Sequence, residues 1–418
     1  MMKIKENKYI KSIATLVSGS MIVQIVTILC SPLMTRLFTP SSLGVYSLVT
    51  SVLTLFGAVM SLRYEICIVS EPDEKKVYSL VKLSFMICFI MSLIIFAGYT
   101  LYFKAINTED NAAVLAAITA VLACLFGAVN ILTAYNNRQK DYKLITKTYV
   151  QRVLSQNILN IASGFLGFGA IGLSASHTIG YMAGVRGQLK PLLKKKDEIK
   201  SVSSGEVKEV FDENINQAVL SSPATFANGL SYSLINYFIE ALFTTEMVGY
   251  YSISYRILGL PITIVSANIS KVFLERASSE YKEKNNFRST FKTTFLISLI
   301  MGLLMGAVLI LFAPWVCELF FGEGWGIAGV YIRILTPMYV LRFIAGGINN
   351  SAVIVQKQHI DLIIQLLLTA TIVAAFIISK IYMFDIETFL GIINIGFCIL
   401  YAVYIFLFWR CSCGKKVK

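Results

Sequence analysis

Four arginines lie inside long apolar stretches and are the strongest candidates for binding chemistry: Arg152, Arg256, Arg333 and Arg342. Arg256 lies ten residues into the apolar segment 246–274, which places it about 15 Å along a helix. An arginine that faced lipid at that depth would cost at least about 2.5 kcal/mol, so it should face protein or water. Because guanidinium binds phosphate in a bidentate manner, these side chains predict a cavity for an anionic substrate.

Three carboxylates in or beside the apolar segments offer a second kind of chemistry. Glu65, Glu240 and Asp361 are candidates for binding a proton or Na⁺, and equally for pairing with the buried arginines. Glu65 continues a stripe of small and polar residues along the segment 43–69, so it should face a cavity. On a regular helix Arg63 cannot face Glu65, and it should reach lipid head groups or another helix instead.

The elements that carry these residues must be membrane helices. Hydrophobic residues make up 56% of the 418 residues and charged ones 15%, with a mean hydropathy of +0.69. Apolar runs of about twenty residues are long enough to cross a bilayer, and only helices satisfy a single spanning segment's backbone there. The sequence therefore predicts an all-α polytopic membrane protein. Its twelve expected spans are 12–34, 43–69, 78–103, 111–134, 144–168, 170–189, 218–240, 246–274, 291–313, 325–350, 360–382 and 388–409.

The basic residues predict how the chain is oriented. With both termini in the cytoplasm, only Arg36, Lys104 and Lys380 of the 37 lysines and arginines lie in outward loops. This asymmetry is typical of a membrane protein inserted with its basic loops on the cytoplasmic side. The net charge of +13 therefore reflects topology and contact with membrane lipids, and it does not indicate a nucleic-acid partner.

An internal repeat predicts two halves. Residues 37–47, LFTPSSLGVYS, align without a gap to residues 242–252, LFTTEMVGYYS, at an offset of 205. Each half then holds six helices, and the two bundles are related by a pseudo-twofold axis along the membrane normal. We expect an N-terminal bundle over 1–189, a polar cytoplasmic linker over 190–217 and a C-terminal bundle over 218–418.

Signals for enzymatic chemistry are missing from the sequence. The eight cysteines have no metal-ligand spacing and predict neither a metal site nor a disulfide framework. No nucleotide-binding loop or nucleophile triad is recognisable. We therefore expect a transporter without a cofactor, in which coupling to H⁺ or Na⁺ remains open.

Two short stretches carry a family resemblance. MTRLFTPSSLGVYSL (34–48) and SLRYEICIV (61–69) resemble the Wzx-type polysaccharide flippases of the multidrug/oligosaccharidyl-lipid/polysaccharide exporter superfamily. The most specific residues are Arg36, Gly44, Arg63 and Tyr64. The resemblance implies a MATE-like fold, a V-shaped pair of six-helix bundles.

The same resemblance implies a function. Such flippases move an undecaprenyl-diphosphate-linked oligosaccharide unit from the cytoplasmic to the outer leaflet by alternating access, for O-antigen (lipopolysaccharide) or capsule biosynthesis. Polysaccharide polymerase and chain-length proteins are the implied partners. The contact with diphosphate maps onto the substrate-binding candidates Arg152, Arg256, Arg333 and Arg342.

Two alternatives remain at this point. A cation-coupled multidrug antiporter of the same fold would need carboxylates deep in its cavity, whereas Glu65 and Glu240 lie near helix ends. A membrane glycan polymerase or ligase would need a long outer loop for its acceptor site, and the outward loops here are short.

Overall fold

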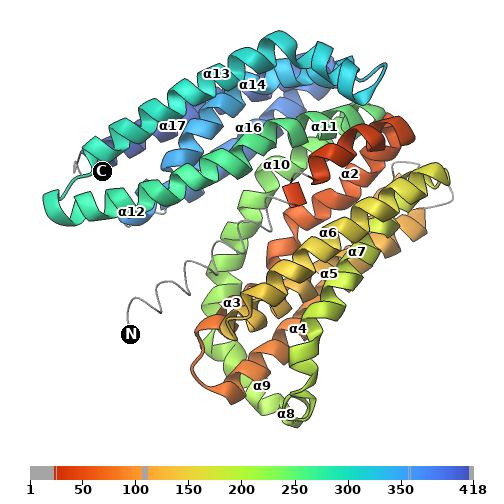
Figure 1. Ribbon diagram of the computed structural model, residues 1–418, viewed down its shortest axis with the longest axis vertical. Coiled ribbons are helices and arrows are strands. Elements are labelled where there is room, and N and C mark those ends of the chain that lie inside the picture. Colours follow the sequence, from red (N-terminus) through yellow and green to blue (C-terminus); the bar gives the residue numbers. More distant parts are fainter. Residues whose placement is uncertain (1–22, 25, 106–111, 356, 358, 414–418) are drawn as a thin grey trace. The chain divides into compact units, whose positions relative to one another are not determined.

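The computed structural model describes residues 23–24, 26–105, 112–355, 357 and 359–413. Within these ranges the chain is almost entirely helical and contains no strand (Figure 1). The helices are α2 (Pro40–Leu55), η1 (Gly57–Val59), α3 (Tyr64–Ser70), α4 (Glu74–Ala105), α5 (Ala112–Arg138), α6 (Tyr142–Phe165), α7 (Gly169–Leu193), α8 (Lys196–Ser201), α9 (Ser204–Glu213), η2 (Gln217–Ser221), α10 (Ser222–Leu242), α11 (Thr245–Pro261), η3 (Ile262–Ser266), α12 (Ala267–Lys284), α13 (Arg288–Phe321), α14 (Gly326–Ile348), α15 (Ser351–Ile354), α16 (His359–Tyr382) and α17 (Ile386–Ser412).

The helices have the lengths and surfaces of membrane spans. Among the described residues, eight helical stretches are long and apolar enough to cross a bilayer. Exposed leucine, isoleucine and phenylalanine side chains are frequent on α13, and only 17% of its most apolar stretch is buried. Such a surface is expected for a helix solvated by lipid. The predicted all-α polytopic class is confirmed.

Most of the expected spans correspond to one helix each. The polar segment 144–168 forms α6, and the segments 170–189 and 218–240 form α7 and α10, although these three are not among the eight most apolar stretches. The first expected span, 12–34, lies mostly outside the described residues, and an apolar helix covers Val26–Leu37.

The expected span 43–69 is not one regular helix. α2 ends at Leu55, and after the short η1 the backbone turns left-handed at Leu62 (φ 48°) and Arg63 (φ 67°) before α3 begins at Tyr64. The carbonyl of Gly57 in this break accepts a hydrogen bond from Asn130 Nδ2 at 3.2 Å, which satisfies a group outside the regular helix. The prediction that 43–69 forms one regular helix is therefore wrong: Arg63 is the N-cap of α3, and Glu65 lies in its first turn.

The chain divides into two compact units, Met1–Gly229 and Leu230–Lys418. In the first unit α4 packs on α5, and α7 packs on α5 and α6. Small residues allow the close approach of α6 and α7: a Cβ added to Gly180 would lie 2.9 Å from the carbonyl oxygen of Arg152.

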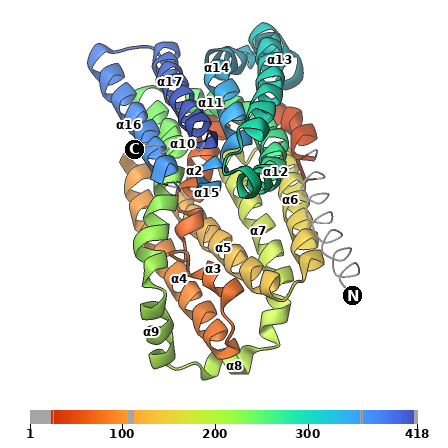
Figure 2. The same ribbon diagram turned by 90° about the vertical axis from the view of Figure 1, so that its left-hand side faces the viewer.

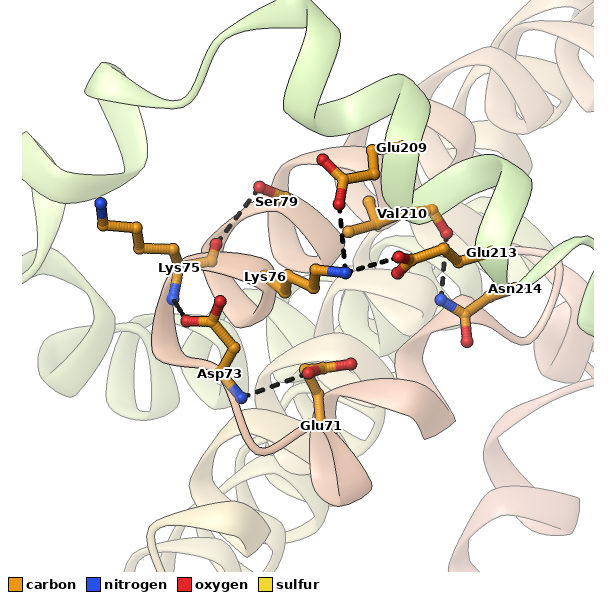
Figure 3. A network of polar contacts seen from close by, with 9 residues as sticks. All are labelled: Glu71, Asp73, Lys75, Lys76, Ser79, Glu209, Val210, Glu213 and Asn214. Carbon is orange, nitrogen blue, oxygen red and sulfur yellow. Dashed lines mark hydrogen bonds and ion pairs between the residues drawn. The ribbon is translucent and has the colours of Figure 1, made fainter.

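The segment 190–217, expected as a linker, is helical and packs on the first unit. Lys76 of α4 forms ion pairs with Glu209 at 3.1 Å and with Glu213 at 2.5 Å of α9 (Figure 3). The ring of Tyr64 stacks on Phe211, and its hydroxyl donates to the Phe211 carbonyl at 3.2 Å. The boundary between the compact units falls within α10, after Gly229.

In the second unit α14 is the central helix, packed against α11, α13 and α17, and α16 lies beside α17 (Figure 2). Two prolines interrupt the backbone bonding of this core without ending either helix: Pro314 in α13 and Pro337 in α14. The N–H of Met338, next to Pro337, donates to Asn394 Oδ1 of α17 at 2.9 Å. α14 runs as one helix from Gly326 to Ile348 with Pro337 inside it.

Candidate functional site

Arg342 lies against a group of tyrosines in the second unit. Its guanidinium carbon is 3.8 Å from the ring centroid of Tyr232 on α10 and 5.4 Å from that of Tyr339 on α14. Tyr255 of α11 lies 6.5 Å from both of these rings, and Tyr401 of α17 shares a hydroxyl–hydroxyl hydrogen bond with Tyr232. We name Arg342, Tyr232, Tyr255, Tyr339 and Tyr401 the C-terminal tyrosine cluster.

The cluster combines one cationic side chain with aromatic faces and hydroxyl groups. A cation held on an aromatic face is stabilised by the ring quadrupole, while its N–H edge stays available to a phosphate. Among the described residues no carboxylate forms an ion pair with Arg342; the ion pairs are Lys76–Glu209, Lys76–Glu213, Arg138–Glu74 and Lys195–Glu198. The positive charge is thus not neutralised by a carboxylate of the described chain.

Arg152 has a similar setting in the first unit. Its guanidinium carbon lies 4.2 Å from the ring centroid of Tyr181 on α7 and 5.0 Å from that of Tyr149 on α6. Its Nε is buried and makes no hydrogen bond to the part of the chain that the structure describes. The stem of Arg152 passes over Gly184, where an added Cβ would lie 3.5 Å from Arg152 Cδ, an ordinary van der Waals distance.

A polar centre adjoins Arg152 through Tyr181. His177 of α7 lies 5.2 Å from the Tyr181 ring, and its Nδ1 is 2.9 Å from the hydroxyl of Tyr46 on α2. Gln156 Nε2 donates to the same hydroxyl at 3.1 Å. His177 is not among the residues predicted for the site; its only signal in the sequence is a lone histidine in a segment rich in serine and glycine.

Arg333 does not join the tyrosine cluster. Its side chain is exposed, and its Nε donates to the carbonyl oxygen of Ile310 on α13 at 2.9 Å. Arg333 and Arg342 are nine residues apart on a continuous helix, which places them on different faces. Arg256 is partly buried on α11, five residues before Pro261 and the π-helical turn η3.

The three carboxylates each accept a hydrogen bond from a hydroxyl group. Glu65 accepts from Ser61, Glu240 from Thr245 at 2.8 Å, and Asp361 from Tyr404. The buried Oε2 of Glu240 has no hydrogen bond among the described residues. In the described ranges none of the three pairs with a lysine or an arginine, so the expected alternative of a carboxylate–arginine pair is not seen.

The four family-motif residues differ in burial and in backbone conformation. Arg36 is exposed in the last turn of the helix Val26–Leu37, where its positive charge interacts favourably with the helix dipole. Gly44 is buried in α2, Arg63 forms the left-handed start of α3, and Tyr64 is fully buried against α9.

Comparisons with known proteins identify a family from the sequence and a fold from the structure. The family model described as "Polysaccharide biosynthesis protein" matches residues 33–328. An inward-facing multidrug resistance MATE family transporter of the MOP superfamily superposes with a TM-score of 0.69 at 18% identity, covering 97% of this chain and 99% of that chain. An outward-facing multidrug resistance MATE family transporter of the MOP superfamily superposes with a TM-score of 0.59 at 17% identity, with 97% of each chain covered.

A third similar structure is a MOP superfamily transporter from Pyrococcus furiosus, for which a binding pocket of reverse polarity suggests a different function. It superposes with a TM-score of 0.59 at 18% identity and covers 97% of both chains. At these identities the likeness establishes the fold, so the predicted MATE-like fold is confirmed. A comparison with curated proteins finds no match.

Proposed function

The chain belongs to the polysaccharide biosynthesis protein family, and on that premise we propose that it flips an undecaprenyl-diphosphate-linked oligosaccharide from the cytoplasmic to the outer leaflet by alternating access. The product would serve O-antigen or capsule synthesis in a bacterial inner membrane, with both termini cytoplasmic. Polymerase and chain-length proteins would then use the flipped unit.

The observation that carries this proposal is the C-terminal tyrosine cluster. Its arginine provides a bidentate donor for phosphate, and its tyrosines provide aromatic faces and hydroxyls for sugar rings. Arg152 on Tyr181 offers the same chemistry in the first unit. The apolar tail of the substrate can remain in lipid while these groups hold its head.

Arg256 remains a proposed substrate contact of the same kind, because it is partly buried on a membrane helix. Arg333 is the weakest of the four, since its guanidinium already donates to Ile310. If a proton or Na⁺ gradient drives transport, the coupling ion would bind Glu65, Glu240 or Asp361. The carboxylate of each accepts a hydrogen bond from a neutral hydroxyl group.

A flipping assay tests the proposal. Purified protein is reconstituted in vesicles with a fluorescent undecaprenyl-diphosphate oligosaccharide, and accessibility of the label to an external quencher is followed. We expect Arg342→Gln to slow flipping about 10- to 100-fold, because a charge-assisted hydrogen bond contributes about 1.5–3 kcal/mol. Arg276→Gln, which removes an exposed arginine of α12, is the matched control and should flip normally.

The outcomes separate the alternatives. If folded Arg342→Gln flips as fast as the wild type, the cluster is structural and the site assignment fails. The solved structures of this fold include multidrug transporters, so the same vesicles are tested for proton-driven uptake of an organic cation. Cation uptake without flipping would replace the flippase proposal by the antiporter.

A further inference from the structure

A groove lies between the beginning of α13 and the end of α17, apart from the tyrosine cluster. Its volume is about 510 Å³, and its wall includes Arg288, Lys292 and Phe295 of α13 and Phe406 and Trp409 of α17. The N–H of Phe287 donates to the Ser412 carbonyl at 3.0 Å, which ties the two helix ends together at the mouth of the groove. Only cationic and apolar side chains line it.

The two cations occupy an electrostatically unfavourable place. Arg288 and Lys292 stand one turn apart on the same helix face, where like charges repel. They also lie in the first turns of α13, where the helix dipole favours negative charge. Both side chains are exposed, and neither forms an ion pair with a described carboxylate. A bound anion would relieve the repulsion between Arg288 and Lys292.

A ligand anion would have to bind side chains here, because two nearby backbone N–H groups already have an acceptor. The N–H groups of Ser289 and Thr290 donate to the carboxylate of Glu280 at 3.3 and 2.9 Å. The helix N-terminus is therefore already capped by Glu280. What remains for a ligand is the charge of Arg288 and Lys292.

The floor of the groove is aromatic and open. Phe291 and Phe295 stack in parallel with ring centroids 6.4 Å apart, and Phe406 lies 5.9 Å from Trp409. The side chain of Leu296 is 51% exposed, and those of Phe406 and Trp409 are 53% and 43% exposed. A cationic mouth that leads to an exposed apolar floor fits an amphipathic ligand with an anionic head.

The helix lengths place this mouth at the membrane surface. α13 has 34 residues, so it is about 51 Å long and extends beyond a hydrocarbon core of about 30 Å. Its first turn should therefore lie at the level of the lipid head groups, and the floor beside it should face acyl chains. Trp409, near the end of α17, has the amphipathic ring that favours this interface.

We propose that this groove binds one anionic phospholipid, with its phosphate on Arg288 and Lys292 and an acyl chain along Phe295, Leu296 and Phe406. Basic pockets between membrane helices are suited to anionic head groups. The lining offers no hydroxyl or amide side chain for sugars, which distinguishes it from the tyrosine cluster. The bound lipid joins the ends of α13 and α17 and stabilises the second unit.

Lipid binding to the purified full-length protein tests this inference. Native mass spectrometry and thermal unfolding in detergent are measured with added phosphatidylglycerol and, separately, phosphatidylcholine of the same acyl chains. We expect phosphatidylglycerol alone to bind tightly and to raise the unfolding temperature. The double variant Arg288→Gln/Lys292→Gln should weaken its binding about 30-fold, since each cation near an anionic lipid contributes about 1 kcal/mol.

Two controls make the result decisive. The double variant Lys194→Gln/Lys196→Gln removes two exposed cations near α8 and should keep wild-type binding. Leu296→Gln polarises the floor, leaves both cations in place and should weaken binding of the acyl chain. Equal binding of the two lipids, or full binding by Arg288→Gln/Lys292→Gln, would overturn the proposal. Binding of undecaprenyl phosphate in preference to phosphatidylglycerol would also overturn it and assign the groove to the isoprenoid carrier.

Discussion

Arg333 of α14 completes the backbone bonding of α13 at a proline. Its Nε donates at 2.9 Å to the carbonyl of Ile310, four residues before Pro314, which has no N–H to offer that carbonyl. The helices approach closely at this point, because a Cβ added to Gly329 would lie 2.3 Å from Pro314 Cα. An arginine that the sequence presents as a substrate ligand thus has a structural role in addition to its charge.

A double-mutant cycle on Arg333 and Pro314 tests this relationship. Arg333→Met should lower the free energy of unfolding by about 1–3 kcal/mol, because it leaves the Ile310 carbonyl unpaired. In a Pro314→Ala background the restored N–H can bond Ile310, so the same substitution should cost less. Thermal unfolding in detergent measures the coupling, and strictly additive effects would contradict it.

Asn394 should be needed for the stability of α14. Asn394→Leu removes the acceptor for the Met338 N–H beside Pro337, so we expect a loss of about 1–3 kcal/mol. Asn394→Asp keeps an acceptor oxygen and serves as the control for helix packing. Unfolding followed by circular dichroism would measure both, and a wild-type melting temperature for the leucine variant would contradict the contact.

The contribution of Tyr232 to flipping should depend on its aromatic ring, which lies against Arg342, rather than on its hydroxyl group. Tyr232→Phe keeps the aromatic face 3.8 Å from the guanidinium and loses the hydrogen bond to Tyr401, so flipping should fall only a few-fold. Tyr232→Leu removes the face and should approach the loss expected for Arg342→Gln. The vesicle assay compares the three, and equal rates for the phenylalanine and leucine variants would exclude a role for the cation–π contact.

The start of α9 should be sensitive to acid. Hydrogen bonds from the backbone N–H and hydroxyl of Ser203 hold the pKa of Glu206 below its ordinary value of 4.5. The ionised carboxylate is favoured in the folded helix, so its contribution is present above the ordinary pKa and is lost as the pH falls through the lowered value.

Hydrogen exchange of the α9 amides between pH 7 and pH 3, corrected for intrinsic exchange rates, measures this effect. Protection should decrease at the acid end in the wild type. Glu206→Gln keeps an acceptor for the Ser203 N–H but cannot titrate, so its protection should lose this acid step. An identical acid step in both proteins would assign the titration to another group.

The sequence by itself determined the class of this protein and the list of charged residues within its apolar segments. Hydropathy and the bias of basic residues are properties of single segments, and hydrocarbon permits an isolated apolar segment only as a helix. The spacing of Arg333 and Arg342, nine residues apart, also places them on different faces of a straight helix. The family stretch 34–48 was likewise readable without any three-dimensional information.

Only the tertiary structure decided which arginine meets which partner. The contacts of Arg342 with Tyr232, and of Arg333 with Ile310, depend on how α14 is rotated against α10 and α13. The left-handed turn at Arg63 and the docking of α9 on Tyr64 also depend on neighbouring helices. Such contacts join residues far apart in the chain, and side-chain packing between helices selects them, so no local pattern in the sequence encodes them.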